Sequence, residues 1–553
     1  MPKATRAYCH SHGTLWRIAE DSVRSLNKVA LLLGEICLTG NLAPMKPKFL
    51  LRIPSAAIDA SVVLPGPAVP ISQAGPEAGQ TLVYAATEQP FAFVPHMQLA
   101  DADAMVQRAR HSFENGPWRR MTAAQRSTVL RNVCAVILTH AEELALLQTL
   151  ETSIPLQQAR GMHVPRAAEN FSFFADIITG LAGESYEQTG RYLSIVTREP
   201  VGTALLIAPW NAPLILSSMK LAAAMALGNS VIVKPSEYAP LAVLRMAELI
   251  VEAGVPADVV QIACGAGQGI GRSLVQHPDI GVVGFIGGTE TGKRIMADAA
   301  GSLKKVGLEL GGKSANIVHR SANLDRAVDG ALLSIFAGNG EQCLAGSRIL
   351  VDDAIADEFI EKFTRRAKAL RIGDPFDPTT EIGPMAFKAH YDRLLDFGQT
   401  AQAGPEYRVL TGATAAPGFD AGYYFAPTVV EASSNTADLC QQELFGPFAV
   451  IQRVADIDDA IARANQSVFG LAAYIWADDL PTVMYARRAL CAGTIWVNTP
   501  MARDLRAPFG GVRQSGIGRD GLPGSIELFT EEKSTLFPNE TFDIPRLGIH
   551  IDN

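Results

Sequence analysis

The sequence predicts an α/β protein with two doubly wound domains. Short apolar runs alternate with helical segments over residues 201–285, and a second alternation runs over residues 316–496, with strands expected at 348–351, 448–451 and 472–476. Strands that alternate with crossover helices form parallel sheets. The chain has 553 residues, 48% of them apolar, which is enough for two or three domains with large cores.

Two amphipathic helices are expected ahead of the first alternation. The apolar spacing is helical over residues 99–113. Further along, Thr122 and Gln125 form a capping-box signature just before another helical apolar pattern. We therefore expect the second helix to begin directly after Thr122.

The first alternation places polar and glycine-rich segments at one edge of the predicted sheet. Strands are expected at residues 204–208, 230–233, 259–263 and 281–285, and helices at 219–227, 241–252 and 270–275. A doubly wound sheet binds ligands beyond the carboxyl ends of its strands. The segments that follow these ends are Pro209-Trp210-Asn211, Lys234-Pro235-Ser236-Glu237 and Gly287-Gly288-Thr289-Glu290. This edge is where we expect a cofactor.

One of these turns is the candidate phosphate site. Gly287 and Gly288 stand between an expected strand and an expected helix, and the free amides and the dipole of a helix start favour an anion. A plain strand-to-helix turn is the alternative. The glycines at 265, 267, 269 and 271 do not form a GxGxxG fingerprint, because Ile270 occupies the third glycine position.

Composition and charge exclude several classes of function. Lys and Arg number 48 and Asp and Glu 56, so the formal net charge is −8 and argues against general attraction to nucleic acid or anionic membrane. The seven cysteines are scattered without a CxxC, and the ten histidines show no HExxH, so neither a disulfide framework nor a metal site is indicated. We expect a cytoplasmic enzyme without metal, nucleic-acid or membrane partners.

The first 55 residues are expected to form a dispensable, poorly ordered extension. Their apolar run at residues 29–33 is too short to span a membrane, and their acidic residues do not suit a transit segment. A translation start at Met45 is the alternative. Cys9, His10 and His12 have no second group of ligands nearby, so no metal is expected there.

Two segments carry the candidate chemistry. Glu309 opens the segment 309–314, which places a carboxylate beside two glycines, and Cys343 lies in a glycine-rich loop at 338–346. A carboxylate base can activate a thiol or a water molecule. An isolated buried cysteine is usually inert, so Cys343 is a candidate nucleophile only together with Glu309.

Taken together, seven segments resemble the aldehyde dehydrogenase superfamily, and the resemblance covers about residues 80–545. In chain order they are PWN, KPSE, GGTE, ELGGKS, GEQC, ELFGP and PFGG, at residues 209–211, 234–237, 287–290, 309–314, 340–343, 443–447 and 508–511. The resemblance implies an aldehyde dehydrogenase-like fold of two Rossmann-type α/β domains with a β-strand oligomerisation arm. It also implies a homodimer or homotetramer.

The resemblance further implies domain boundaries. The NAD-binding domain would cover residues 56–181 and 201–310, and the catalytic domain 311–513. The oligomerisation arms would be residues 182–200 and 528–542, followed by a tail at 543–553.

Three residues receive catalytic roles from the resemblance. Cys343 would attack the aldehyde as a thiolate, and the Asn211 side-chain amide and the Cys343 backbone N–H would hold the oxyanion of the resulting thiohemiacetal. After hydride transfer to nicotinamide, Glu309 would activate the water that hydrolyses the thioester. The implied reaction is NAD-dependent oxidation of an aldehyde to a carboxylic acid.

Cofactor-binding residues follow in the same way. Lys234 and Glu237 would bind the adenosine ribose hydroxyls, Glu443 would bind the nicotinamide ribose, and Phe445 would pack against the cofactor. Because a carboxylate at Glu237 would repel a 2′-phosphate, NAD is expected rather than NADP. The other expected cofactor-binding residues are Ala208, Pro209, Trp210, Gly267, Gly287, Gly288 and Leu310.

Two arginines suggest an anionic substrate. Arg503 lies shortly before the PFGG segment, Arg166 lies in the segment 164–174, and a guanidinium matches a carboxylate bidentately. The segments that contain these arginines, 164–174 and 497–511, resemble those of the hydroxymuconic semialdehyde branch of the family, and Phe509 is the third expected substrate-binding residue. The expected substrate is 5-carboxymethyl-2-hydroxymuconate semialdehyde or a related semialdehyde from aromatic ring cleavage. Pairing of Arg503 with Asp504 or with another acid is the structural alternative.

Other functions stay open at this point. A neutral aromatic aldehyde or betaine aldehyde is the alternative substrate, because Met219 and the segment 500–502 depart from the usual substrate tunnel. A catalytically silent scaffold of the same fold is less favoured, since Cys343, Glu309 and Asn211 are all present.

Overall fold

The computed structural model describes residues 48–75, 78–188 and 190–548. The predicted disorder of residues 1–47, the alternative start at Met45 and the Cys9, His10 and His12 cluster lie outside these ranges. The predicted end of the extension at residue 55 is wrong. Strand β1 (Phe49–Arg52) pairs antiparallel with β2 (Ser61–Leu64), and its partly buried Leu51 packs against the main apolar core.

The first sheet has the strand order β10-β9-β8-β11-β12-β20. Its strands are β8 (Thr203–Ile207), β9 (Ser230–Lys234), β10 (Val260–Ile262), β11 (Val282–Ile286), β12 (Lys305–Glu309) and β20 (Gly516–Ile517). They are parallel except for β20, which runs antiparallel to β12. The chain passes from β8 outward to β10 and returns to the other side of β8 for β11. The switch point of the topology therefore lies between β8 and β11, where such sheets bind ligands.

Helices cover both faces of this sheet, as a doubly wound fold requires. Leu206 faces a core built with α8 and α9, whereas its neighbour Leu205 faces a core built with α2, α10 and α11. The helices and turns of this part are α2 (Leu99–Asn115), α8 (Pro213–Ala226), α9 (Leu241–Glu252), η4 (Ala257–Val259), η5 (Gly267–Gly271), α10 (Arg272–Gln276), α11 (Thr289–Ala299), η6 (Ala300–Ser302) and α18 (Leu522–Phe529).

Several sequence boundaries need correction here. Helix α8 begins six residues before the expected start at 219, because Pro213 suits the first helical position. The helix expected at 270–275 is a π-helical turn, η5, followed by the short α10. Strand β20 adds to the first sheet a segment that follows residue 513, which the predicted boundaries did not include.

The second sheet has the order β15-β16-β17-β14-β13-β18-β19 and is parallel except between β15 and β16. Its strands are β13 (Ala315–Val318), β14 (Arg348–Asp352), β15 (Tyr407–Thr411), β16 (Thr428–Ala432), β17 (Phe448–Val454), β18 (Ala472–Trp476) and β19 (Thr494–Val497). Its helices and turns are α12 (Leu324–Phe336), η7 (Ala337–Gly340), α13 (Asp353–Lys368), α14 (Lys388–Ala403), α15 (Asp438–Gln441), α16 (Ile457–Asn465), α17 (Leu480–Ala489) and η8 (Arg513–Ser515). The second predicted α/β unit is therefore present, with strands at all three expected places.

The amino-terminal part combines helices with a small sheet that the sequence patterns did not predict. The sheet has the order β3-β5-β4, from β3 (Val69–Pro70), β4 (Gly79–Tyr84) and β5 (Gln89–Pro95), next to the turn η1 (Ile71–Gln73). The helices are α3 (Pro117–Arg120), α4 (Ala123–Thr139), α5 (Ala141–Thr152), α6 (Leu156–Gln158), η2 (Ala159–His163), α7 (Val164–Ile177) and η3 (Ile178–Gly180). The capping box at the start of α4 is confirmed, since both of its reciprocal hydrogen bonds form.

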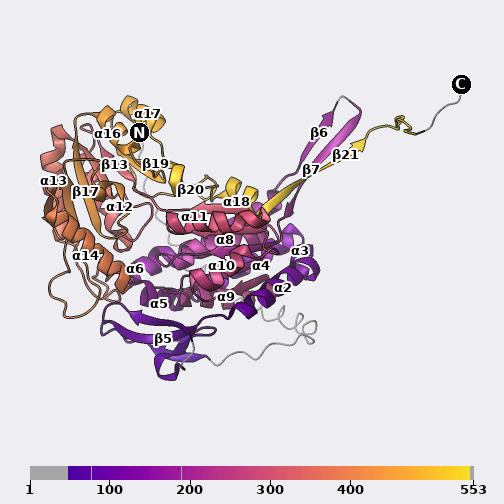
Figure 1. Cartoon of the computed structure of the whole chain (residues 1–553), viewed down its shortest axis with the longest axis horizontal. Coiled ribbons are helices and arrows are strands. Elements are labelled where there is room, and N and C mark those ends of the chain that lie inside the picture. Colours follow the sequence, from indigo (N-terminus) through magenta and orange to yellow (C-terminus); the bar gives the residue numbers. More distant parts are fainter. Residues whose placement is uncertain (1–47, 76–77, 189, 549–553) are drawn as a thin grey trace, which may run out of the picture. The chain divides into compact units, whose positions relative to one another are not determined.

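The segments expected as arms form an antiparallel ribbon in the order β21-β7-β6. They are β6 (Glu184–Gln188), β7 (Tyr192–Pro200) and β21 (Thr530–Pro538). In Figure 1 this ribbon extends away from the two large sheets, and most of its residues are exposed.

Within the described ranges, no single helix is long and apolar enough to cross a membrane. Helices α4 and α5 together have the length and apolar composition of a membrane span, but they are bent by 70° at the break between them.

Candidate active site

The predicted catalytic residues come together from both α/β units. Glu309 is the last residue of β12, Asn211 follows β8, and Cys343 lies between η7 and β14. The glycine turn after Glu309 packs directly on the cysteine loop, because a Cβ atom on Gly312 would lie only 2.6 Å from the Cys343 carbonyl oxygen. The two loops are thus held together at a position where only glycine fits.

Asn211 is fixed to the same cysteine loop. Its buried Nδ2 donates a hydrogen bond of 2.7 Å to the Glu341 carbonyl, two residues before Cys343. An amide nitrogen carries two N–H groups, so this bond orients the side chain and leaves a second donor. Such a donor beside a nucleophile can stabilise a developing oxyanion.

Burial controls the protonation of the thiol and of the carboxyl group. It raises the pKa of the Cys343 thiol to about 12, with further increases from Glu443 and Glu309. Burial also raises the pKa of the Glu309 carboxyl well above its usual range, and the Asp520 carboxylate raises it further against the opposing effects of Lys220, Arg503 and Arg519. Glu309 Oε2 has no hydrogen-bond partner among the described residues, so this carboxyl can accept a proton.

A buried ion pair lies next to this carboxyl. Lys220 Nζ of α8 donates to Asp520 Oδ1 at 2.6 Å, and both side chains are almost fully buried. Asp520 is joined by two backbone bonds to Phe509, the residue expected to contact the substrate. Sequence patterns missed this pair, because its partners are 300 residues apart and neither belongs to a recognisable motif.

The two candidate arginines differ in how they are paired. Arg166 on α7 forms an ion pair of 2.8 Å with Glu169. The Arg503 guanidinium stacks on the Phe509 ring, 4.1 Å from its centroid, and its Nη2 atom is buried without a hydrogen-bond partner within the described part of the chain. Asp504 does not neutralise it, since that carboxylate binds Arg506 at 2.6 Å. An Arg503–Asp504 pair is therefore wrong, and among the described residues Arg503 forms no ion pair with another acid either.

Arg503 is close enough to the reacting groups to interact with their charges. Burial lowers the pKa of Arg503, Arg166 lowers it further, and Asp520, Glu309 and Cys343 oppose that decrease. A buried cation that lacks a hydrogen-bond acceptor beside a nucleophile favours an anionic group on the molecule that binds there.

The expected cofactor edge forms at the switch point of the first sheet. Ala208, Pro209 and Trp210 follow β8, and the Ala208 N–H donates to the Lys234 carbonyl at the end of β9. The buried Lys234 ammonium pairs with Glu237 at 3.2 Å. A lysine and a carboxylate side by side supply a donor and an acceptor for adjacent hydroxyl groups.

The glycines at this edge leave room for a phosphate. Gly287 follows β11, and Gly288 precedes α11 without a side-chain cap, so the first-turn amides of that helix are available to an anion. A Cβ atom on Gly288 or on Gly267 would meet no atom within 4 Å, whereas one on Gly287 would meet the Phe285 ring at 2.5 Å. With the uncapped start of α11, these residues are the ones that would hold the diphosphate of a dinucleotide.

The predicted nicotinamide-side residues lie nearer the catalytic loops. The Leu310 N–H donates to the Ser515 carbonyl, and Glu443 Oε1 accepts a 2.9 Å hydrogen bond from the Gly312 N–H. Burial raises the pKa of Glu443 to about 7. Phe445 packs edge-on against Trp210, with ring centroids 5.3 Å apart. The cofactor edge and the cysteine loop are therefore continuous through the Gly311–Gly312 turn.

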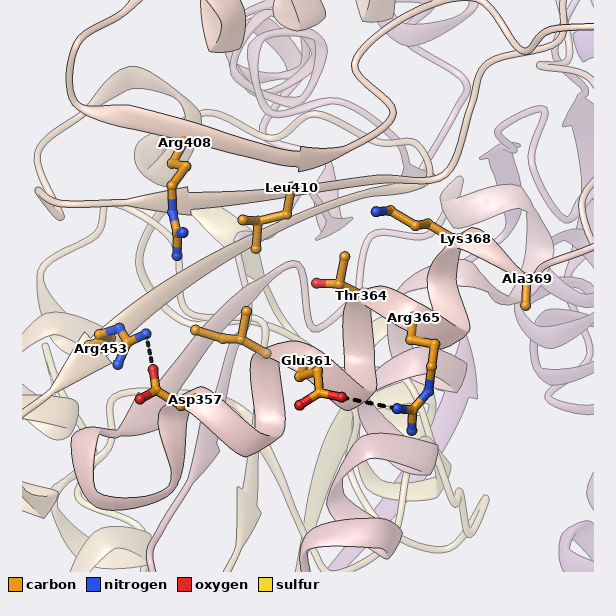
Figure 2. Close-up of a pocket in the computed structure, with 10 residues that line it drawn as sticks. Asp357, Glu361, Thr364, Arg365, Lys368, Ala369, Arg408, Leu410 and Arg453 are labelled. Atoms are coloured by element: carbon orange, nitrogen blue, oxygen red, sulfur yellow. Dashed lines mark hydrogen bonds and ion pairs between the residues drawn. The ribbon is translucent and has the colours of Figure 1, made fainter.

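A separate basin on the second domain does not share this chemistry. It measures about 700 Å³ and lies between α13, β15 and β17. Figure 2 shows Arg453 of β17 paired with Asp357 of α13, and Arg365 paired with Glu361 one turn away on α13. None of the residues that line the basin is a predicted site residue.

In the described ranges, we find no group of three His, Cys, Asp or Glu side chains arranged to bind a metal.

Comparison with known proteins agrees with this geometry. The chain matches the aldehyde dehydrogenase family over residues 72–535. The chain belongs to the aldehyde dehydrogenase family. It is 38% identical to the NADP/NAD-dependent aldehyde dehydrogenase PuuC of Escherichia coli K12, over 81% of this chain and 90% of that protein.

Solved structures of similar proteins confirm the aldehyde dehydrogenase fold. PnpE from Pseudomonas sp. WBC-3 is 36% identical with a TM-score of 0.82, over 85% of this chain and 96% of that chain. HpcC from Thermus thermophilus is 34% identical with a TM-score of 0.82, over 85% of this chain and 92% of that chain. PnpE has also been solved in complex with nicotinamide adenine dinucleotide. NAD(P)-dependent oxidation of an aldehyde is the activity of this enzyme.

Proposed function

We propose that this aldehyde dehydrogenase oxidises a carboxylate-bearing semialdehyde, 5-carboxymethyl-2-hydroxymuconate semialdehyde or a related hydroxymuconic semialdehyde, with NAD as the acceptor. The supporting observation is the Arg503 guanidinium, whose buried Nη2 atom has no hydrogen-bond acceptor among the described residues and which interacts with the charges of Cys343 and Glu309. A substrate carboxylate would supply that acceptor. Arg166, which also repels Arg503, would face the same anion.

The proposed chemistry uses three residues of the chain. Cys343 releases its thiol proton to solvent, and its sulfur then bonds to the aldehyde carbon as the carbonyl π bond breaks. The carbonyl oxygen becomes an oxyanion held by the Asn211 amide and the Cys343 N–H. The cofactor supplies a hydride acceptor. Loss of hydride from the carbon leaves a thioester, and Glu309 takes a proton from the water that attacks it. The acid leaves, and the sulfur is again free.

Electrostatics also discriminates between the alternative substrates. Betaine aldehyde is a cation, so the Arg503 guanidinium, which interacts with Cys343, would oppose its binding. A neutral aromatic aldehyde has no carboxylate to accept a hydrogen bond from the buried Arg503 Nη2 atom. Leaving that donor without an acceptor costs free energy of binding. Glu237 beside Lys234 supports NAD over NADP, because the carboxylate would repel a 2′-phosphate.

The test compares steady-state oxidation of carboxymethylhydroxymuconic semialdehyde with that of benzaldehyde, followed by NADH absorbance. Replacing Arg503 with Gln removes a charge-assisted contact of about 1.5 to 3 kcal/mol, so kcat/KM for the acidic substrate should fall about ten- to a hundredfold. Arg506→Gln is the matched control, because its side chain already pairs with Asp504. Equal kcat/KM for the acidic substrate in wild type and Arg503→Gln would refute the proposal.

The proposal includes a homodimer or homotetramer and a cytoplasmic location. The exposed faces of β6 and β21 support the homo-oligomer, because they carry three apolar or aromatic side chains that are each about half exposed, Tyr186, Leu536 and Phe537. The cysteines of the described residues form no disulfides, which fits the proposed cytoplasmic location. Light scattering of the intact chain measures the assembly, and a monomer at micromolar concentration would refute it.

A further inference from the structure

Two aromatic side chains connect the nucleophile loop with the loop that carries Arg503. Tyr474 of β18 and Trp496 of β19 are direct partners in adjacent parallel strands. Their rings stack with centroids 4.9 Å apart and an interplanar angle of 25°. Both side chains are buried, in one apolar cluster that also contains Phe509 and contacts Cys343.

The polar end of each ring is bonded to a different loop. The Tyr474 hydroxyl donates to the Leu344 carbonyl at 2.9 Å, at the residue after Cys343. The Trp496 indole N–H donates to the Ala502 carbonyl at 2.6 Å, at the residue before Arg503. One stacked pair on a rigid sheet therefore holds the backbone next to the nucleophile and the backbone next to the cation.

The loop that carries Arg503 needs such support. It follows β19 and has no regular secondary structure. Asn498 and Met501 in this loop have positive φ angles of 51° and 54°, a backbone conformation that residues other than glycine rarely adopt. Backbone of this kind keeps one conformation only where its surroundings hold it. The Trp496 indole N–H binds the carbonyl of Ala502, which lies between Met501 and Arg503. This hydrogen bond therefore restrains the backbone directly before the residue that carries the guanidinium.

We propose that Trp496 is a positioning residue that determines substrate specificity, because its indole N–H sets the separation between the Cys343 sulfur and the Arg503 guanidinium. That separation selects carboxylated aldehydes of one length. The inference rests on the proposed function, since it requires Arg503 to bind the substrate carboxylate. Tyr474 acts on the other side of the stack, where it orients the nucleophile loop for every substrate.

The test uses aldehydes that carry a terminal carboxylate at increasing distance, namely succinic, glutaric and adipic semialdehyde and the carboxymethylhydroxymuconic semialdehyde, with benzaldehyde as the neutral reference. Trp496→Phe keeps a stacking ring but removes the N–H donor together with the second ring of the indole, so 3-benzothienylalanine at position 496, which removes the N–H alone, is tested beside it. We expect wild type to prefer one length, and Trp496→Phe to lower kcat/KM for that substrate about tenfold through KM and to flatten the preference. Benzaldehyde kinetics should stay within about twofold of wild type.

Tyr474→Phe is the matched counterpart. It should lower kcat for acidic and neutral aldehydes alike and leave the length preference in place. If Trp496→Phe reduces turnover of benzaldehyde as much as that of the acids, Trp496 is only structural and the inference fails. An unchanged length preference also overturns it.

A failure of the proposed function gives a different result. In that case wild type does not prefer the acids, and Arg503→Gln changes nothing. The inference alone fails when wild type prefers the acids and Arg503→Gln abolishes the preference, but Trp496→Phe retains it. If Trp496→Phe does not fold, 3-benzothienylalanine at position 496 provides the same ring shape without the N–H, and the same outcomes apply.

Discussion

The buried ion pair between Lys220 and Asp520 makes the sharpest prediction about this enzyme. Its two charges lie 2.6 Å apart, which corresponds to an attraction of about 6 kcal/mol at an effective dielectric constant of about 20. The cost of removing both charges from water offsets much of this. Removing one partner leaves the other buried and uncompensated, so Asp520→Asn or Lys220→Met should lower the free energy of unfolding by about 3 to 5 kcal/mol.

The same two substitutions should move the pH dependence of turnover in opposite directions. Asp520 raises the pKa of Glu309 and Lys220 lowers it. Glu309 must be deprotonated to act as a base, so kcat rises with pH through its pKa. Asp520→Asn should shift this rise to lower pH, and Lys220→Met should shift it to higher pH.

Urea denaturation followed by tryptophan fluorescence measures the stability, and NADH absorbance across pH measures the profile. The double substitution Lys220→Met with Asp520→Asn should be less destabilising than the sum of the single ones. Asp176→Asn is the matched control, because its pair with Arg131 lies at the surface, where such pairs contribute little. Strict additivity, or pH profiles that move in the same direction, would refute the reasoning.

Three further predictions test other parts of the structure. Thr122→Ala removes the hydroxyl of the α4 capping box and should lower the free energy of unfolding by about 1 kcal/mol, measured by urea denaturation; no change would contradict the observed cap. Gly312→Ala places a methyl group 2.6 Å from the Cys343 carbonyl and should lower kcat about a hundredfold, whereas Gly180→Ala, which meets no atom within 4 Å, should not. Glu309→Gln removes the base for thioester hydrolysis, so rapid-mixing absorbance should show one burst of NADH per active site and little turnover afterwards; full turnover would exclude that role.

Local signals predicted the regular elements well. The expected helix at 241–252 coincides with α9, and the expected strand at 472–476 coincides with β18. Apolar spacing is set by the helix and strand periods, and capping bonds join residues three apart, so both are visible in a short window of sequence. Sequence patterns did not predict the sheet of β3, β4 and β5, where the pairing rather than the local period defines the strands.

In the candidate site, too, some residues are visible in short sequence segments and others only through their contacts with distant segments. The segments that carry the family resemblance named Cys343, Glu309 and Asn211 as candidate catalytic residues, and each stands in a loop or at the end of a strand. They did not name Asp520 or Trp496, whose importance comes from a partner on a distant segment or in a neighbouring loop.

The sequence by itself determined the kinds of chemical group and the strand ends that carry them, since composition and period are local properties. Only the tertiary structure decided which charges are paired. Asp504 binds Arg506 and leaves Arg503 with a buried donor that has no acceptor among the described residues, an outcome that four adjacent residues could not specify. Burial and long-range contacts set the energies of buried charges, and both arise only when distant segments pack together.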